Sequence, residues 1–292
     1  MSISGNTKLI YVIGNPISHS LSPAMHNTAL NAQNLDIVYL PLKLTLETLP
    51  AFCQNIKNSN ILGANVTIPF KEAIIPYLDT LSDEAQVIGA VNTLQVKDDQ
   101  LIGHNTDAMG FYNHLIDATK FIPSSQTVAL LGAGGAAKAI AYILLKKGIQ
   151  TLHIINRNLN RADTLKKQLS PHLETGQNIS VHESGQNTEE TVLPTCGLII
   201  NTTPLGMTPD CDSTPTQSNA WCHQEQIVYD TIYTPEKTQW LKSCEEKGAT
   251  ICNGLGMLIG QGVLSYNLFT GQEADPKLFK SGIEAVLWKK KI

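Results

Sequence analysis

The sequence predicts an α/β protein of two domains, and three observations lead to this prediction. The chain has 292 residues, enough for two ordinary domains that each bury an apolar core. In its first third, short apolar runs alternate with amphipathic stretches, which is typical of a mostly parallel sheet covered by helices on both faces. After a Pro-Ser-Ser linker at residues 123–125, a second buried-strand pattern runs directly into a glycine-rich turn.

In the first domain, apolar periodicity separates strands from helices. Strands are expected at residues 9–13, 37–41 and 63–68, and helices at residues 22–34 and 45–58. Ser22 precedes Pro23 at the first helix start, where serine is a favoured N-cap and proline fits the next position. Ser18 and Ser20 are then not needed for capping and are available to bind a carboxylate.

The second domain opens with a strand at residues 127–131, followed by a helix that runs through Lys147 and stops at Gly148. Further strands are expected at residues 151–155 and 197–200. The polar stretch at residues 170–190 is expected at the surface. Two helices, at residues 254–269 and 276–289, close the chain.

Composition favours a small-molecule partner. With a net charge of −4, 42% hydrophobic and 16% charged residues, the chain has no basic excess to attract nucleic acid. Its six cysteines form no C-x-x-C pair and no group at metal spacing, so we expect reduced thiols and no metal. No leader pattern is present and no apolar run approaches the roughly 18 residues that span a bilayer. We therefore expect a cytoplasmic protein without a membrane contact.

The glycine-rich turn fits a dinucleotide-binding site. Gly132, Gly134 and Ala137 follow a predicted strand and open a predicted helix. Glycines at this spacing permit a tight turn and a close approach of backbone amides to a pyrophosphate. Glycine-rich turns also occur without a ligand, so the strand-turn-helix context carries this interpretation.

The end of the next strand indicates which nucleotide is bound. An NAD enzyme usually carries an acid there, which accepts from the ribose 2′-hydroxyl. Here the residues are Asn156, Arg157 and Asn158, and Arg161 follows one turn later. Both guanidinium groups can pair with a 2′-phosphate, so NADP is favoured over NAD. The alternative is that both arginines are surface charges at a helix start.

A second group of polar residues lies at the end of the predicted strand 63–68. The two-residue period places Asn65 and Thr67 on one face. Pro69 ends the ladder, so Lys71 emerges near the strand end, where open sheets build their ligand sites. A lysine there can be an acid/base group or an anion clamp, although in isolation a solvated lysine is the more common case. The clusters at residues 89–93 and 103–107 have a similar form, which turn chemistry alone would also explain.

Taken together, these segments resemble the shikimate dehydrogenase family, whose motifs they match in the same order over nearly the whole chain. No single match is decisive, but their joint order is, because unrelated dinucleotide-binding proteins share only the glycine-rich turn. The matching segments are residues 14–20, 63–71, 89–93, 105–107, 132–136, 156–157, 201–207, 229–230 and 254–261.

The resemblance implies an N-terminal α/β substrate-binding domain of residues 1–107, completed by C-terminal helices at residues 254–292. It implies a Rossmann-type NADP-binding domain of residues 108–253, with the active site in the interdomain cleft. The implied activity is the reversible NADPH-dependent reduction of 3-dehydroshikimate to shikimate, on the pathway to chorismate and the aromatic amino acids. The implied partners are this small molecule and NADP, without a metal, in a monomer or homodimer.

The resemblance also implies roles for individual residues. Lys71 and Asp107 flank the C3 oxygen, where the Lys71 ammonium stabilises negative charge and delivers a proton. Ser18 and Ser20 hold the substrate carboxylate. The remaining substrate-binding positions are Asn65, Thr67, Asn92, Asp107, Tyr233 and Gln261. The cofactor-binding positions are Asp83, Gly132, Ala133, Gly134, Gly135, Ala136, Asn156, Arg157, Asn158, Arg161, Thr202, Thr231 and Gly254.

Three positions depart from the family pattern. His104, Ala108 and Asn253 stand where an acid, a glycine and an aspartate are more common. None of them removes an implied contact, and we expect His104 to be an exposed loop histidine rather than a catalytic one.

Two other functions stay open. A quinate/shikimate dehydrogenase would use the same Lys71 and Asp107 but would accept quinate and NAD as well. The turn at residues 156–158 argues against this alternative because it favours NADP. A catalytically silent NADP-sensing regulator would keep the fold, and the intact Lys71 and Asp107 pair argues against it.

Overall fold

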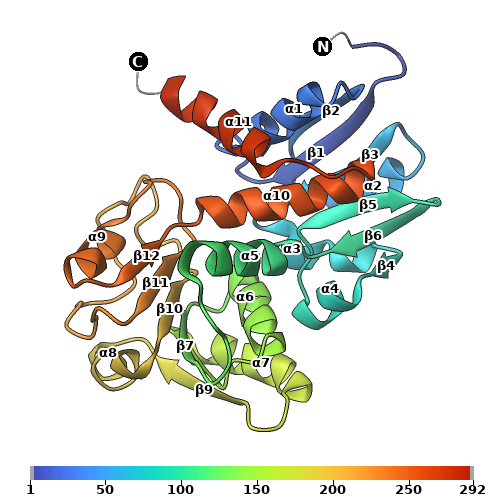
Figure 1. Ribbon diagram of the computed structural model, residues 1–292. Helices are drawn as coiled ribbons and strands as arrows, with labels where there is room; N and C mark the ends of the chain where they lie inside the picture. The colour runs from blue at the N-terminus through green and yellow to red at the C-terminus, as the bar shows by residue number, and fades with distance from the viewer. Residues whose placement is uncertain (1–2, 290–292) are drawn as a thin grey trace. The chain divides into compact units, whose positions relative to one another are not determined.

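The computed structural model describes residues 3–289 (Figure 1). The described chain divides into two units, one holding the residues up to Gly110 and from Ile259 onward, the other running from Phe111 to Leu258. Both divisions fall inside helices, whereas the family resemblance implies boundaries after residues 107 and 253. Helical hydrogen bonding continues across both divisions, so no turn or linker signal marks them in the sequence.

The first unit is built on a six-stranded mixed sheet in the order β2-β1-β3-β5-β6-β4. The pairs β1·β2, β1·β3 and β4·β6 are parallel, and β5 runs antiparallel to both β3 and β6. Five strands therefore run in one direction and only β5 is reversed, which confirms the mostly parallel sheet expected here. The strands are β1 (Lys8–Gly14), β2 (Ile37–Lys43), β3 (Ile61–Val66), β4 (Thr80–Leu81), β5 (Thr93–Lys97) and β6 (Gln100–His104).

The reversed strand β5 is joined to β6 by a hairpin. Its turn residues Asp98 and Asp99 have φ values of 50° and 60°, which a two-residue turn between strands requires and which aspartate tolerates better than most residues. This hairpin carries Thr93 and His104 opposite each other. It thereby brings the polar clusters at residues 89–93 and 103–107 together.

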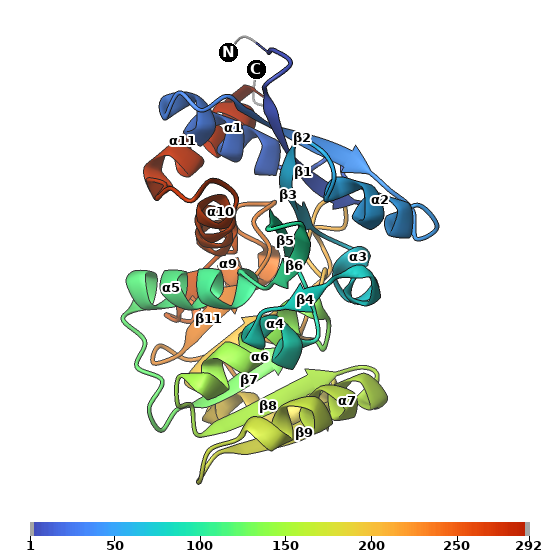
Figure 2. The same ribbon diagram turned by 90° about the vertical axis from the view of Figure 1, so that its right-hand side faces the viewer.

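Helices cover both faces of this sheet. On one face, residues of α2 and α3 share an apolar core with β1 and β3, for example Leu49 and Phe70 with Ile13 and Val66. On the other face, α1 and α11 lie side by side (Figures 1 and 2). The helical elements of the first unit are α1 (Ser22–Ala32), α2 (Leu49–Ile56), α3 (Phe70–Ala73), η1 (Ile75–Tyr77), α4 (Asp83–Ile88), most of α10 (Leu255–Thr270) and α11 (Pro276–Lys289).

The start of α1 differs from the expectation. Leu21 occupies the N-cap position without a side-chain cap, and Pro23 lies in the first turn. The Ser20 hydroxyl accepts from the Ser22 backbone N–H at 3.3 Å, so Ser22 is not the N-cap and Ser20 does part of the capping. The Ser22 side chain is buried instead.

The second unit is a six-stranded parallel sheet in the order β12-β11-β10-β7-β8-β9. The strand order reverses between β7 and β10, which makes this a doubly wound sheet and confirms the predicted Rossmann-type fold. Ligands bind such sheets at the reversal point, beyond the carboxyl ends of the strands. The strands are β7 (Thr127–Leu131), β8 (Thr151–Asn156), β9 (Asn178–Glu183), β10 (Leu198–Asn201), β11 (Ile227–Asp230) and β12 (Thr250–Cys252).

Helices cover both faces of the second sheet as well. Right-handed crossovers place α6 and α7 on one face, while Trp240 and Leu241 of α9 pack with Ala129 and Val228 on the other. Aromatic contacts of Phe111 with Tyr229 attach α5 to the α6 face. The helical elements are α5 (Asp107–Thr119), α6 (Gly135–Lys146), α7 (Leu159–Leu169), η2 (Ser170–His172), α8 (Gln186–Thr191), η3 (Leu193–Thr195) and α9 (Gln239–Glu246).

The polar stretch at residues 170–190 is not simply surface. It contains the edge strand β9 and most of α8. Glu189 is 7% exposed, and its carboxylate accepts from the backbone N–H groups of Gln217 and Ser218 at 2.8 and 3.0 Å. An edge strand tolerates polar residues, which is why its composition misled the prediction.

Among the described residues, no helix combines the length and apolarity that crossing a bilayer requires. All six cysteines are free, and five of them are buried. Burial raises the pKa of Cys53 and Cys196 to about 11, so both remain protonated near neutral pH.

The fold predicts a specific acid sensitivity. His26 of α1 is fully buried and stacked on Tyr39, and burial lowers its pKa from 6.5 to about 3. Below pH 6.5 His26 therefore binds a proton in the unfolded chain but not in the folded protein. The free energy of unfolding consequently falls as the pH decreases from 6.5 toward 3. For His26→Phe, which keeps an aromatic ring, we expect the loss between pH 6.5 and 5 to shrink by about 2 kcal/mol.

Urea unfolding of the wild type and His26→Phe at both pH values would measure this difference. His172→Gln, which replaces an exposed histidine, is the control and should lose stability as the wild type does. Equal losses in the wild type and His26→Phe would contradict the assignment.

Candidate active site

A lysine and an aspartate form an ion pair beyond the carboxyl end of β3. Lys71 lies on α3 and Asp107 is the first residue of α5, and the Lys71 Nζ donates to Asp107 Oδ2 at 2.5 Å. Their side chains are 20% and 8% exposed, so the pair is largely shielded from water but still accessible. The position of Asp107 at a helix N-terminus further favours its negative charge.

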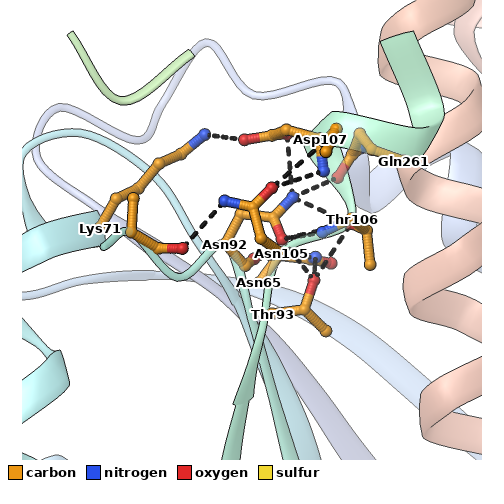
Figure 3. A network of polar contacts seen from close by, with 10 residues as sticks. Asn65, Lys71, Asn92, Thr93, Asn105, Thr106, Asp107 and Gln261 are labelled. Atoms are coloured by element: carbon orange, nitrogen blue, oxygen red, sulfur yellow. Dashed lines mark hydrogen bonds and ion pairs between the residues drawn. The ribbon is translucent and has the colours of Figure 1, made fainter. Parts of the chain in front are cut away.

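The Asn92 carboxamide connects this pair to the neighbouring strands (Figure 3). Its Nδ2 donates to Asp107 Oδ1 and to Thr106 Oγ1, both at 2.9 Å, and lies 3.4 Å from Gln261 Oε1 of α10. Its Oδ1 accepts from the Thr106 backbone N–H at 2.7 Å and from the Thr93 hydroxyl at 3.0 Å. The 2% exposed Asn92 thereby holds the free oxygen of the Asp107 carboxylate in place.

Asn105 positions the start of α5. Its Oδ1 accepts from the backbone N–H groups of Asp107 and Ala108 at 3.1 and 3.3 Å, and its Nδ2 donates to the Ala90 carbonyl at 2.9 Å. The sequence motif gave Asn105 and Thr106 no role of their own. The pattern of an amide two residues before a helix-starting acid is the signal that would have identified Asn105 as a cap.

Asn65 and Thr67 differ in their surroundings. Asn65 lies on β3 and is 6% exposed, and its Nδ2 donates to the Asn92 carbonyl and to Thr93 Oγ1 at 3.2 and 3.1 Å. Thr67 lies beyond the strand, because β3 ends at Val66 and the Phe70 N–H bonds the Thr67 carbonyl to form a turn. The strand expected through residue 68 is therefore two residues too long.

Ser18 and Ser20 lie on the loop between β1 and α1, in the same unit. Ser18 is exposed and Ser20 is half-buried. The backbone next to Ser20 is fixed by its N–H, which bonds the Ile17 carbonyl at 3.1 Å. Asp83, also in this unit, is an exposed residue in the first turn of α4.

In the second unit, the glycine-rich turn connects β7 to α6 at the reversal point of the sheet. Gly132 has a φ of 113°, and a Cβ there would lie 2.5 Å from Thr202 Oγ1, so folding itself requires glycine. Gly134 is different: its φ is −92°, it is exposed, and a Cβ would meet nothing within 4 Å. A glycine that folding does not need fits a ligand that passes close to the backbone.

The other residues of this turn, Ala133, Gly135 and Ala136, are half-buried. The four N–H groups of the first turn of a helix have no partner within the helix. These amides and the open space beside Gly134 suit a pyrophosphate.

Both arginines of the chain lie where β8 ends. Asn158 is the N-cap of α7 and accepts from the Arg161 N–H at 3.2 Å, and the Asn156 side chain donates to the Asn158 carbonyl at 2.8 Å. The side chains of Arg157 and Arg161 are exposed, and within residues 3–289 neither forms an ion pair. Two guanidinium groups without a carboxylate partner suit a phosphate.

A buried carboxylate organises the loops that follow β10 and β11. Asp230 accepts from the Asn201 Nδ2 at 3.0 Å, the Ile232 N–H at 3.1 Å and the Thr238 hydroxyl at 2.8 Å. Burial raises the pKa of Asp230 to about 6, although these three hydrogen bonds oppose the shift. These bonds link the segments that carry Thr202, Thr231 and Tyr233.

Thr202, Thr231 and Tyr233 are half-buried. Gly254 follows β12, and its missing side chain leaves room for the Thr231 carbonyl, which a Cβ would approach to 2.0 Å.

The three residues that depart from the family pattern, His104, Ala108 and Asn253, are all half-buried or buried. His104 is not an exposed loop residue: it ends β6, is half-buried, and burial lowers its pKa. Strand pairing with Thr93 holds it there. Ala108 is fully buried in α5. Asn253 accepts from the Leu255 N–H and donates to the Glu236 carbonyl, and an aspartate could make only the first of these bonds.

The structure thus brings together one part of the expected site within each unit. Lys71, Asn65, Asn92, Asp107 and Gln261 lie in one polar network of the first unit. The glycine-rich turn, both arginines, Thr202, Thr231, Tyr233 and Gly254 lie in the second unit. Within the described residues, no group of three or more His, Cys, Asp or Glu side chains is arranged to hold a metal ion.

Comparisons with known proteins identify three family segments. A model described as the shikimate dehydrogenase substrate binding domain matches residues 12–94. A model described as shikimate / quinate 5-dehydrogenase matches residues 117–185, and one described as the shikimate 5′-dehydrogenase C-terminal domain matches residues 254–281.

Whole proteins are similar over nearly their full length. The chain is 41% identical over 283 residues to the shikimate dehydrogenase (NADP(+)) of Carboxydothermus hydrogenoformans, covering 97% of this chain and 99% of that protein. A crystal structure of a shikimate dehydrogenase in complex with NADP+ gives a TM-score of 0.90 at 35% identity, with 97% of each chain covered. Shikimate 5-dehydrogenase from Listeria monocytogenes, in complex with shikimate and NAD, gives a TM-score of 0.90 at 33% identity, covering 96% and 98%.

Substitution of the two glycines of the turn is expected to affect stability to different degrees. For Gly132→Ala we expect a loss of about 1–3 kcal/mol in the free energy of unfolding, because alanine disfavours the positive φ and its Cβ meets Thr202. For Gly134→Ala we expect a change within about 0.5 kcal/mol, because neither strain nor contact opposes the methyl group. Urea unfolding of both variants measures this, and equal losses would contradict the distinction.

Proposed function

Because the chain belongs to the shikimate dehydrogenase family, we propose that it catalyses the reversible NADPH-dependent reduction of 3-dehydroshikimate to shikimate. This reaction lies on the pathway to chorismate and the aromatic amino acids. The observation that carries the proposal is the Lys71–Asp107 pair, set within a network of neutral amide and hydroxyl groups. Such a site suits a small acid with several hydroxyl groups and one oxygen that gains and loses a proton.

The substrate contacts follow from the chemistry of the first unit. Ser18 and Ser20 offer hydroxyl donors on an accessible loop, which suits the substrate carboxylate. The ring hydroxyls, each both donor and acceptor, suit the amide and hydroxyl groups of Asn65, Thr67, Asn92 and Gln261 and the carboxylate of Asp107. Tyr233 of the second unit would complete the substrate contacts.

NADPH, when bound, supplies the hydride that reduces the C3 carbonyl. Lys71 then stabilises the negative charge that develops on that oxygen and donates a proton from its Nζ. The ammonium has three donors, and the Asp107 bond occupies one of them, so a second can point to the substrate. Asp107 holds the amine in position, and in the reverse direction the neutral amine accepts the proton back.

The NADP contacts follow from the second unit. Arg157 and Arg161 would pair with the 2′-phosphate, and Asn156 and Asn158 shape the turn that carries them. The pyrophosphate would lie against the backbone amides of residues 132–136, at the start of α6. Thr202, Thr231 and Gly254 would lie toward the nicotinamide, with Asp230 fixing the two loops that carry both threonines. Asp83 of the first unit is a further, weaker candidate contact.

Location in the cytoplasm, and assembly as a monomer or homodimer, remain predictions from the sequence. The quinate-accepting and non-catalytic alternatives are both addressed by the same assay. Purified protein is incubated with shikimate or quinate, with NADP or NAD, and the absorbance of the reduced nicotinamide is followed at about 340 nm. We expect the fastest reduction with shikimate and NADP, and no shikimate-dependent reduction would overturn the proposal.

Replacement of Lys71 tests the acid/base role. For Lys71→Ala we expect turnover to fall by roughly 10²-fold or more, with a smaller change in the KM for shikimate, because a general acid/base acts in the transition state. Lys57→Ala is the matched control: Lys57 forms an ion pair with Asp79 at 3.0 Å in the same unit, outside the site. Wild-type turnover in Lys71→Ala would remove Lys71 from the mechanism.

Replacement of Arg157 tests the nucleotide preference. For Arg157→Ala we expect about a tenfold rise in the KM for NADP and little change in the use of NAD, because only NADP carries the 2′-phosphate. Lys167→Ala removes an exposed cation from α7, the helix that follows Arg157, and should leave both values unchanged. Equal effects of Arg157→Ala on the two nucleotides would refute the phosphate contact.

A further inference from the structure

The hydroxyl of Tyr39 makes the shortest of the hydrogen bonds to the Asn65 carboxamide. Tyr39 lies on β2, is fully buried, and donates to Asn65 Oδ1 at 2.7 Å. The other bonds of this carboxamide, to Asn92, Thr93 and Ser265, measure 3.1 to 3.4 Å. Tyr39 is therefore the strongest constraint on the position of a side chain for which we propose a substrate contact.

Helix α1 fixes Tyr39 at its backbone and at its ring. The Asn27 side chain donates to the Tyr39 carbonyl at 2.8 Å and accepts from the Tyr39 N–H at 2.9 Å. The His26 ring stacks on the Tyr39 ring, with the ring centroids 4.2 Å apart and an angle of 6° between the ring planes.

The direction of the Tyr39 bond is determined by its surroundings. Asn65 Nδ2 faces the Asn92 carbonyl, which can only accept, so the amide group must lie on that side. Asn65 Oδ1 then faces Tyr39, and the phenol must donate. Ser265 approaches the same oxygen only to 3.4 Å, which leaves acceptor capacity for a substrate hydroxyl.

We propose that Tyr39 is a positioning residue of the substrate site, which holds the Asn65 carboxamide in the orientation that accepts a ring hydroxyl. The inference rests on the proposed function and extends it to a residue that does not itself contact substrate. It also assigns a purpose to His26 and Asn27, whose contacts converge on Tyr39.

The test compares two tyrosines that are buried next to the same histidine. Tyr39→Phe removes only the hydroxyl and keeps the ring on His26. We expect the KM for shikimate to rise by about tenfold, as for the loss of one well-placed hydrogen bond, with kcat within about threefold and the KM for NADP unchanged. Tyr266→Phe is the matched control, because Tyr266 is equally buried beside His26 but its hydroxyl bonds Gln33.

A double-mutant cycle shows whether Tyr39 acts through Asn65. In an Asn65→Ala background, Tyr39→Phe should have no further effect on the KM for shikimate, because the group that it positions is gone. Additive effects in the double variant would overturn the inference, as would a wild-type KM in Tyr39→Phe. Direct titration of shikimate into each purified variant provides a binding readout besides activity.

Asn27→Ala tests Tyr39 through its contact with α1 and keeps the inference testable if Tyr39→Phe folds poorly. It removes both side-chain bonds to the Tyr39 backbone, and we expect a smaller rise in the KM for shikimate with the KM for NADP unchanged. An unchanged KM for shikimate in Asn27→Ala would also count against the inference. Wild-type protein that fails to oxidise shikimate would instead refute the proposed function, so the two failures are distinguishable.

Discussion

The hydrogen bonds of the Asn92 carboxamide are the interactions on which the candidate active site depends. Its Nδ2 donates to the Asp107 carboxylate and its Oδ1 accepts from the Thr106 backbone N–H. One side chain therefore positions both Asp107 and the start of α5, the helix that begins at this residue. Burial of the Asp107 carboxylate, whose side chain is 8% exposed, costs several kcal/mol unless donors and a cation compensate. Asn92, Lys71 and the α5 N-terminus together supply that compensation.

The two units stabilise buried charge in different ways. In the first, the Asp107 carboxylate faces a cation; in the second, the Asp230 carboxylate faces only neutral donors, and its pKa rises to about 6. The folded protein therefore holds a proton on Asp230 more tightly than the unfolded chain does, and this group lowers stability as the pH rises from 3.8 toward 6. We infer that this cost is tolerated because Asp230 connects two loops that must keep a fixed arrangement.

Much of the fold could be predicted from the sequence because local pattern and tertiary environment agree. The strand at residues 127–131 and the helix at residues 276–289 match the structure at both ends, since buried apolar runs and a proline at the helix start mark them. The β5–β6 hairpin and β9 were missed, because two aspartates formed the hairpin turn and β9 is a polar edge strand.

The candidate site was predictable to a different degree in each part. The motifs named the residues that have chemistry of their own, such as Lys71 and Asp107. They included Asn105 and Asp230 without a role and did not include Tyr39, and these three residues act by holding a neighbour. Tyr39 is 26 residues from Asn65 in the chain, and its hydroxyl finds that partner only because β2 and β3 both pair with β1. No local pattern encodes such a contact.

The placement of both arginines at the end of β8 has a practical consequence. All other basic side chains of the chain, histidines aside, are lysines. A guanidinium-selective reagent such as a dicarbonyl would therefore modify only this one turn. Its rate of reaction would then report occupancy of a single patch on the whole protein, without a substitution or a coupled assay.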